Sequence, residues 1–137
     1  MERPILSARG AAGYLEALDN VLLLTHVRPD GDTIGSARHN AAAPYWAPEG
    51  WQAEHIVSVD IADASLLPEN AKKYASCIDL AIDHHPSNEG FAKESCVLAE
   101  MAACGEIIYE IAGLMTSMTA EIALPLYVAV SLSLIHI

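Results

Sequence analysis

Aspartate and histidine side chains follow three separate apolar stretches of the chain, and both residue types are common metal ligands. Carboxylate and imidazole groups without a thiolate suit Mn²⁺, with Fe²⁺, Co²⁺ or Mg²⁺ as substitutes. Carboxylates that converge raise one another's pKa, and divalent cations remove that penalty. Two ions sharing a carboxylate can generate a hydroxide nucleophile and hold a transferring phosphoryl group, so phosphate ester hydrolysis is the natural reaction. The candidate residues are His26, Asp30, Asp32, Asp60, Asp83, His84 and His85.

Short apolar runs precede these polar groups and predict buried parallel strands. The runs are Val21–Leu24, His55–Val59 and residues 80–82, and residues 97–98 predict a short fourth strand. In open parallel sheets, ligands bind beyond the carboxyl ends of the strands. If the first three strands are neighbours, the aspartates and histidines that follow them converge on one pocket.

Helical patterns alternate with the strands and predict an α/β fold: a mostly parallel sheet flanked by helices. Ser7 is placed to cap a first helix that runs to about Leu18, and Thr119 is placed to cap a last helix that contains Pro125. Further helical stretches are expected at residues 33–42, 68–75 and 103–115. In the last of these, the helical spacing predicts a buried face made of Ile107, Ile108, Ile111 and Leu114.

Each candidate group also has a simpler structural interpretation when it is taken alone. The Asp30-x-Asp32 pair lies in a Pro/Gly loop, where aspartates commonly stabilise turns. Adjacent histidines such as His84 and His85 are more often surface or core residues than ligands, and Asp60 fits a cap for the following segment. The same chemistry after three strands is what favours a metal site.

Composition limits the classes of partner. The 137 residues carry a net charge of −11, and 53% are hydrophobic, which excludes wholesale disorder and argues against a basic surface for duplex DNA or an anionic membrane. The three cysteines are an odd number without CxxC spacing, which fits a reducing, cytoplasmic location. The uncharged run at residues 122–137 is too short and too polar to predict a membrane span.

Three of these segments, read as motifs, resemble those of the DHH phosphoesterases. Residues 26–36 (HVRPDGDTIGS) resemble the first motif, residues 57–63 (VSVDIAD) the second and residues 82–88 (IDHHPSN) the eponymous third. Residues 102–110 are similar to the helix that follows the third motif in one branch of this family, the oligoribonucleases and the phosphatases of 3′-phosphoadenosine 5′-phosphate (pAp). A nucleotide-binding module without hydrolysis is disfavoured because the chain has neither a GxGxxG nor a GxxxxGK[ST] loop.

The resemblance implies a site with two Mn²⁺ ions, for which Mg²⁺ or Co²⁺ can substitute. His26 and Asp30 would hold one ion, Asp32 and His84 the other, and Asp60 would bridge both. Asp83 would orient a histidine from behind the ligands. His85 would face the scissile phosphate, Asn88 would reach the substrate, and a hydroxide between the metals would attack phosphorus.

The resemblance also implies the substrates and partners. They are short single-stranded oligonucleotides cut from an end, 3′-phosphoadenosine 5′-phosphate (pAp), or cyclic-dinucleotide breakdown products. Duplex DNA and membranes are not expected as partners. Full-length members of the family could form homodimers.

Two departures from the family predict an incomplete enzyme. Only residues 37–54 separate the first two motifs, where the family has a further strand and helix, and the end of the chain lacks the Asp-Thr-Gly of a fourth motif. Residues 1–137 are therefore expected to form a single DHH-type catalytic domain without that motif or the C-terminal substrate-binding domain. The alternative function is a catalytically inactive, metal-binding fragment of such an enzyme.

Overall fold

The structure is a computed structural model that describes residues 4–25 and 49–135, with side chains described as far as residue 131. Four strands, three α-helices and two short 3₁₀ helices form the regular secondary structure of this part of the chain. In chain order the elements are α1 (Ala8–Glu16), β1 (Val21–Leu24), β2 (His55–Val59), η1 (Ala64–Leu66), η2 (Glu69–Tyr74), β3 (Leu80–Asp83), β4 (Glu94–Val97), α3 (Cys104–Met115) and α4 (Ala120–Ile135).

The four strands form one parallel sheet in the order β1-β2-β3-β4. This confirms that the first three predicted strands are neighbours. The register places Val59 of β2 beside Ile82 of β3, and the Asp60 N–H continues the ladder by donating to the Ile82 carbonyl (2.9 Å). The residues that follow β2 and β3 therefore leave the sheet at the same level.

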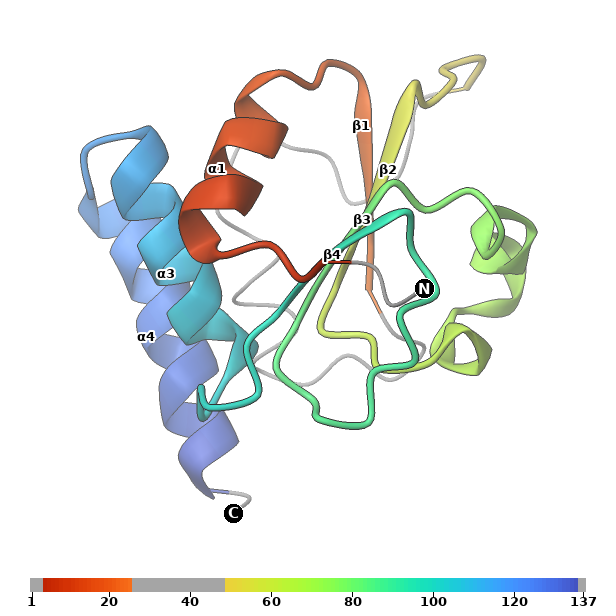
Figure 1. The fold of residues 1–137 in the computed structure, drawn as a ribbon. Coiled ribbons are helices and arrows are strands. Elements are labelled where there is room, and N and C mark those ends of the chain that lie inside the picture. The colour runs from red at the N-terminus through yellow and green to blue at the C-terminus, as the bar shows by residue number, and fades with distance from the viewer. Residues whose placement is uncertain (1–3, 26–48, 136–137) are drawn as a thin grey trace.

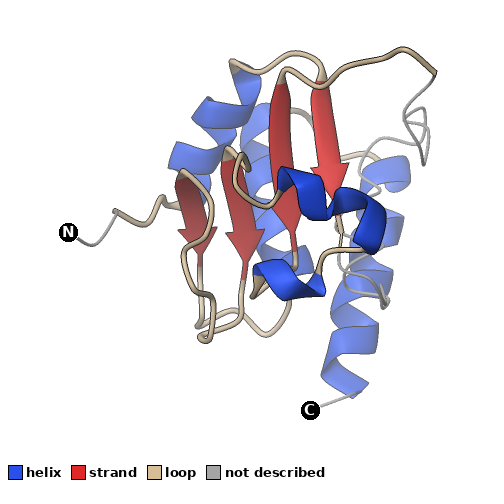
Figure 2. Ribbon diagram, turned by 90° about the vertical axis from the view of Figure 1, so that its right-hand side faces the viewer, coloured by secondary structure: helices blue, strands red, loops and turns tan. Residues whose placement is uncertain are grey.

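Helices cover the two faces of the sheet unequally. Helices α1, α3 and α4 lie on one face, and the 3₁₀ helices lie on the other (Figures 1 and 2). On the helical face, Val57, Leu80 and Cys96 pack against α1 and α3. Side chains on the opposite face, such as Ile56 and Ala81, pack against the 3₁₀ segments. A sheet covered on both faces explains why β1, β2 and β3 are mostly apolar in sequence.

The predicted element boundaries mostly hold. The Ser7 side chain accepts a hydrogen bond from the Gly10 N–H (3.1 Å), which confirms the first cap, although α1 ends at Glu16 rather than near Leu18. The stretch predicted at 68–75 forms the 3₁₀ helix η2, with Pro68 as its cap. The helix expected at residues 33–42 lies outside the described residues.

Two expectations were wrong. Strand β4 begins at Glu94, three residues before the predicted start, because pairing with β3 rather than hydrophobicity defines it. Leu114 is 42% exposed and not part of the core, whereas Ile107, Ile108 and Ile111 are buried as predicted. The reason is that the chain is exposed from Gly113 through Ser117, where α3 ends and turns toward α4.

Helix α4 is apolar on every side and still lies at the surface. Leu126 and Ala129 are buried, while Leu124 and Tyr127 are 66% and 70% exposed. No helix in the described part of the chain is both long enough and apolar enough to cross a membrane.

Asp79, just before β3, links the beginnings of three strands. Its buried Oδ2 accepts from the Ile56 N–H (2.9 Å) and its Oδ1 from the Lys93 ammonium (2.6 Å). Its own N–H donates to the Ile56 carbonyl (2.8 Å), and its carbonyl accepts from the Glu94 N–H (2.8 Å). Burial alone would raise the pKa of the Asp79 carboxyl, but the bonds from Lys93 and Ile56 outweigh it and lower that pKa.

We expect Asp79→Ala to reduce the free energy of unfolding by about 1–3 kcal/mol, because the buried Ile56 N–H loses its acceptor. Lys93→Met is the control: it removes an exposed ammonium and leaves the Ile56 bond intact, so its effect should be much smaller. Urea denaturation measures both variants. Equal losses would contradict the role of the Asp79–Ile56 bond.

The Asp79 carboxyl should also contribute a pH-dependent part of the stability. Because its pKa in the folded chain is below the unfolded value of 3.8, the contribution is complete above that value and is lost as the pH falls through the lower, folded pKa. Urea midpoints should thus fall less on acidification for Asp79→Asn than for the wild type. Parallel curves for the two proteins would contradict this.

Candidate metal centre

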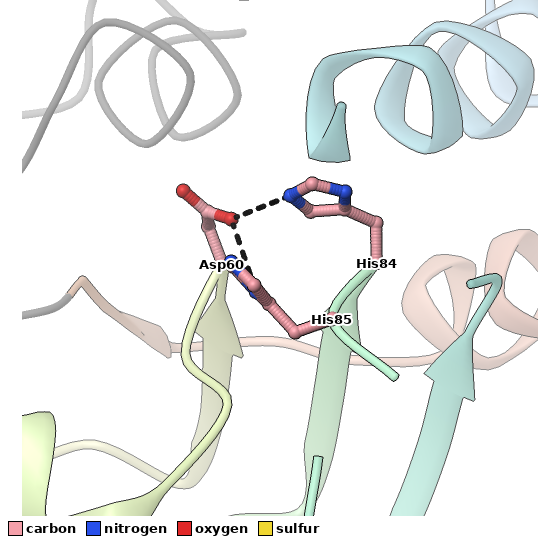
Figure 3. Close-up of side chains that lie close together, drawn as sticks. All are labelled: Asp60, His84 and His85. Carbon is pink, nitrogen blue, oxygen red and sulfur yellow. Dashed lines mark ion pairs between the residues drawn. The ribbon is translucent and has the colours of Figure 1, made fainter. Parts of the chain in front are cut away.

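Asp60 is the first residue beyond β2 and has an unusual backbone conformation. Its φ is +61°, in the left-handed region that non-glycine residues seldom adopt, and the residue is only 3% exposed. This turn of the backbone directs the carboxylate toward the end of β3 (Figure 3). A strained backbone and a buried carboxylate in one residue are typical of a functional position.

Two histidines follow β3 and face this carboxylate. Asp60 Oδ1 lies 3.6 Å from His84 Nε2 and 3.8 Å from His85 Nδ1 (Figure 3). The two rings lie side by side, with centroids 4.4 Å apart. The His84 side chain is 17% exposed, and that of His85 is 42% exposed. One imidazole is thus enclosed beside Asp60, and the other opens to solvent.

Asp83, the last residue of β3, is fully buried behind the histidines. Its Oδ1 accepts from the His84 N–H (2.8 Å) and lies 2.7 Å from His85 Nδ1, while its Oδ2 accepts from Asn88 Nδ2 (2.8 Å). Burial alone would raise the pKa of the Asp83 carboxyl, but the bonds from His85 and Asn88 outweigh it and lower that pKa. Asp83 is therefore held as a carboxylate.

The acceptors behind the two rings define which nitrogens carry protons. Because a carboxylate and a carbonyl only accept, His85 Nδ1 donates to Asp83, and His84 Nδ1 donates to the Met101 carbonyl (3.3 Å). In the neutral rings both Nε2 atoms are then unprotonated. Metal-binding histidines usually have this arrangement, with the second nitrogen bonded to a carboxylate or a backbone carbonyl.

The arrangement fits a divalent cation. Asp60, His84 and His85 each offer a ligand atom, and these atoms lie within 4.8 Å of one another. Two ligands about 2.1 Å from one ion, at angles of 90–120°, are about 3.0–3.6 Å apart. The 3.6 Å between His84 Nε2 and Asp60 Oδ1 falls at the upper end of this range. Mixed oxygen and imidazole ligands suit Mn²⁺ and related ions.

The structure thus brings together part of the site proposed from the sequence. Asp60 and His84 lie together at the ends of β2 and β3, with His85 and Asp83 next to them. The other three proposed ligands, His26, Asp30 and Asp32, lie outside the described residues. The metal-binding and catalytic roles of all these residues stay predictions.

Two sets of contacts around the histidines were not predicted from the sequence. The Met101 carbonyl orients His84, and no side-chain pattern could reveal a backbone acceptor that lies 17 residues away. The Asn88 amide bonds to Asp83 and to the Ile61 carbonyl, and its expected contact with a substrate stays a prediction. Its position five residues after Asp83, in a Pro/Ser/Gly loop, was the available signal.

Comparisons with known proteins show the fold. A similar solved structure is that of an exopolyphosphatase-related protein from Bacteroides fragilis, with 20% sequence identity and a TM-score of 0.70. The match covers 93% of this chain and 50% of that one, so the chain spans about half the length of that protein. No family profile and no curated protein matches the sequence. The likeness confirms the α/β architecture with a parallel sheet.

We expect Asp60→Gly to abolish Mn²⁺ binding without destabilising the metal-free protein. Glycine accepts the left-handed backbone but has a more flexible unfolded state, so the free energy of unfolding should stay within about 1 kcal/mol of the wild type. Asn20→Gly is the matched control, because Asn20 also has a positive φ (+50°) and precedes β1. Isothermal titration with Mn²⁺ and urea denaturation in EDTA measure the two effects. Wild-type Mn²⁺ affinity in Asp60→Gly would contradict the assignment.

Proposed function

We propose that this chain is a metal-dependent phosphoesterase that hydrolyses short oligonucleotides or pAp, with Mn²⁺ as its cofactor. The observation that carries the proposal is the convergence of Asp60, His84 and His85 where β2 and β3 end. Both rings are held through Nδ1, that of His84 by the Met101 carbonyl and that of His85 by Asp83. The carboxyl end of a parallel sheet is also where ligands bind in open α/β folds.

The charge of the site supports a role for cations in binding phosphate. Asp60 and Asp83 are buried at the ends of neighbouring strands, and the whole chain carries −11. Without cations these carboxylates would repel a phosphate group. Divalent ions held by Asp60 and His84 would reverse the sign of the local field. When bound, such ions would also activate water and neutralise charge on the phosphoryl group.

Asp60, His84, His85 and Asp83 would have different roles in binding the cation and the phosphate. Asp60 and His84 are the more enclosed pair and would hold a cation between them. The more exposed His85 would face the phosphate, with Asp83 behind it to stabilise its protonated form. In that position the His85 Nε2 can transfer a proton to or from a reacting oxygen, as a general acid–base group does.

The nature of the substrate rests on two arguments of different kinds. The similar solved structure is described as exopolyphosphatase-related, which supports hydrolysis of a phosphoryl linkage. The motifs in this sequence resemble those of the oligoribonuclease and pAp-phosphatase branch, which favours nucleotides over inorganic polyphosphate. A test of substrates should therefore include polyphosphate beside pAp and a short RNA.

We expect Mn²⁺-dependent hydrolysis of pAp or of a short RNA, lost on treatment with EDTA and restored by Mn²⁺. His84→Ala should lower kcat/KM at least about 100-fold, because metal stabilisation of the transition state is worth several kcal/mol. His55→Ala is the control, since His55 begins β2 at the opposite end of the sheet. Phosphate release assays measure both.

Three outcomes would contradict this proposal. Full activity in EDTA would exclude a metal-dependent mechanism. Rapid hydrolysis of polyphosphate without cleavage of pAp or RNA would show that nucleotides are not the substrate. Mn²⁺ binding that requires Asp60 and His84 but gives no turnover would favour the alternative, a metal-binding fragment without catalysis.

A further inference from the structure

The backbone turns sharply at Asp60, where the chain leaves the sheet. The Asp60 N–H still belongs to the ladder, because it donates to the Ile82 carbonyl (2.9 Å). From this fixed point the chain continues with a φ of +61° at Asp60. A left-handed backbone is unfavourable for a residue with a Cβ, although Asp and Asn tolerate it better than most. Such a conformation persists where contacts hold the chain on both sides of it.

Two residues of the β3–β4 connection hold the peptides that follow Asp60. Asn88 Nδ2 donates to the Ile61 carbonyl (3.1 Å), and the Glu89 N–H donates to the Ala62 carbonyl (3.2 Å). The Ile61 side chain is also fully buried, in the core on the face that the 3₁₀ helices cover. Asp60 therefore lies between two pieces of backbone that are each held by hydrogen bonds.

The Asn88 amide is itself held in one orientation. Its Nδ2 also donates to Asp83 Oδ2 (2.8 Å), and its Oδ1 accepts from the Gly90 N–H (2.9 Å). If the oxygen and nitrogen were exchanged, the oxygen would face two acceptors, the Asp83 carboxylate and the Ile61 carbonyl. The donor that reaches Ile61 thus has a defined direction.

The Asn88 bond constrains the chain close to Asp60. One peptide unit separates the Asp60 N–H from the Ile61 carbonyl, so few backbone rotations can absorb a shift between them. The Glu89 bond acts one residue further along the chain. The packing of the Ile61 side chain is apolar, and apolar burial is less directional than a hydrogen bond. The direction of the chain after Asp60 is therefore tied closely to Asn88.

We propose that Asn88 is a positioning residue for Asp60: its bond to the Ile61 carbonyl holds Asp60 in the left-handed conformation that directs the carboxylate toward the end of β3. The value of that direction rests on the proposed function, in which Asp60 holds a cation. This role needs no contact between Asn88 and the cation. Hydrogen bonds behind a metal ligand typically change metal affinity by about 10- to 100-fold.

The test measures the backbone of Asp60 in the metal-free protein, through three-bond NMR couplings that depend on φ. The wild type should show a positive φ at Asp60. Asn88→Ala and Asn88→Leu both lack the donor and should move part of the Asp60 population to negative φ. Asn20 also has a positive φ (+50°) and should keep its couplings in both variants, because it precedes β1 at the other end of the sheet. It is the internal control for general loosening of the fold.

Gly90→Ala is the matched control for strain in the same loop. Gly90 has a φ of +65°, so alanine is strained there, but in the described part of the chain no atom beyond its neighbours in sequence lies within 4 Å of the added Cβ. The donors of Asn88 stay in place, so the Asp60 couplings should stay those of the wild type. Isothermal titration with Mn²⁺ should give about 10-fold weaker binding for the two Asn88 variants and wild-type affinity for Gly90→Ala.

A negative φ at Asp60 in the wild type overturns the proposal, and this result needs no variant to fold. Unchanged Asp60 couplings in folded Asn88→Ala and Asn88→Leu overturn it as well. So does an equal change in Gly90→Ala, since the effect would then belong to the loop and not to the Asn88 donor. Failure of the proposed function is a separate result: absent hydrolysis by the wild type would leave the couplings, measured without metal, intact.

Discussion

The buried charge of Asp83 is the constraint on which the site depends. An ionised carboxylate with no solvent contact costs several kcal/mol unless donors surround it. Here the donors are the His84 N–H, the His85 ring and the Asn88 amide, all from the segment that immediately follows. To satisfy Asp83, this segment must fold back over the end of β3, and in doing so it places both imidazole rings beside Asp60. The need to pair the buried Asp83 carboxylate therefore also determines where the two histidine rings lie.

The sheet supplies the second half of that geometry. Because β2 and β3 are adjacent, parallel and in register at Val59 and Ile82, the residues that follow them emerge side by side. The left-handed backbone of Asp60 then turns its carboxylate toward the histidines. At the opposite end of the sheet, the Asp79 carboxylate connects the starts of these strands through Ile56 and Lys93. One buried aspartate thus aligns the strands where they begin, and another organises the loop where β3 ends.

The sequence was informative where burial alone defines an element. The runs at Val21–Leu24 and His55–Val59 are mostly apolar, and both strands were predicted with correct bounds. Strand β4 was misplaced because Glu94 and Ser95 are polar and pair through the backbone. The grouping of Asp60 with the histidines followed from strand order, whereas the bonds of Asn88 and the Met101 carbonyl depend on distances that a sequence does not contain. The first motif lies outside the described residues.

The connection between β3 and β4 has a consequence for how the site moves. Parallel strands are commonly joined by a dozen or more residues that include a helix, but here residues 84–93 make the crossover without one. Phe91 and Ala92 of this connection pack into the core on the face of the sheet that the 3₁₀ helices cover. The histidine segment is thus anchored by strand β3 before it and by core side chains at its far end, so we expect its opening to disturb that core as well. Its amide hydrogens should exchange with solvent together with those of β3 and β4, as members of one cooperative unit and not as a separate flexible lid.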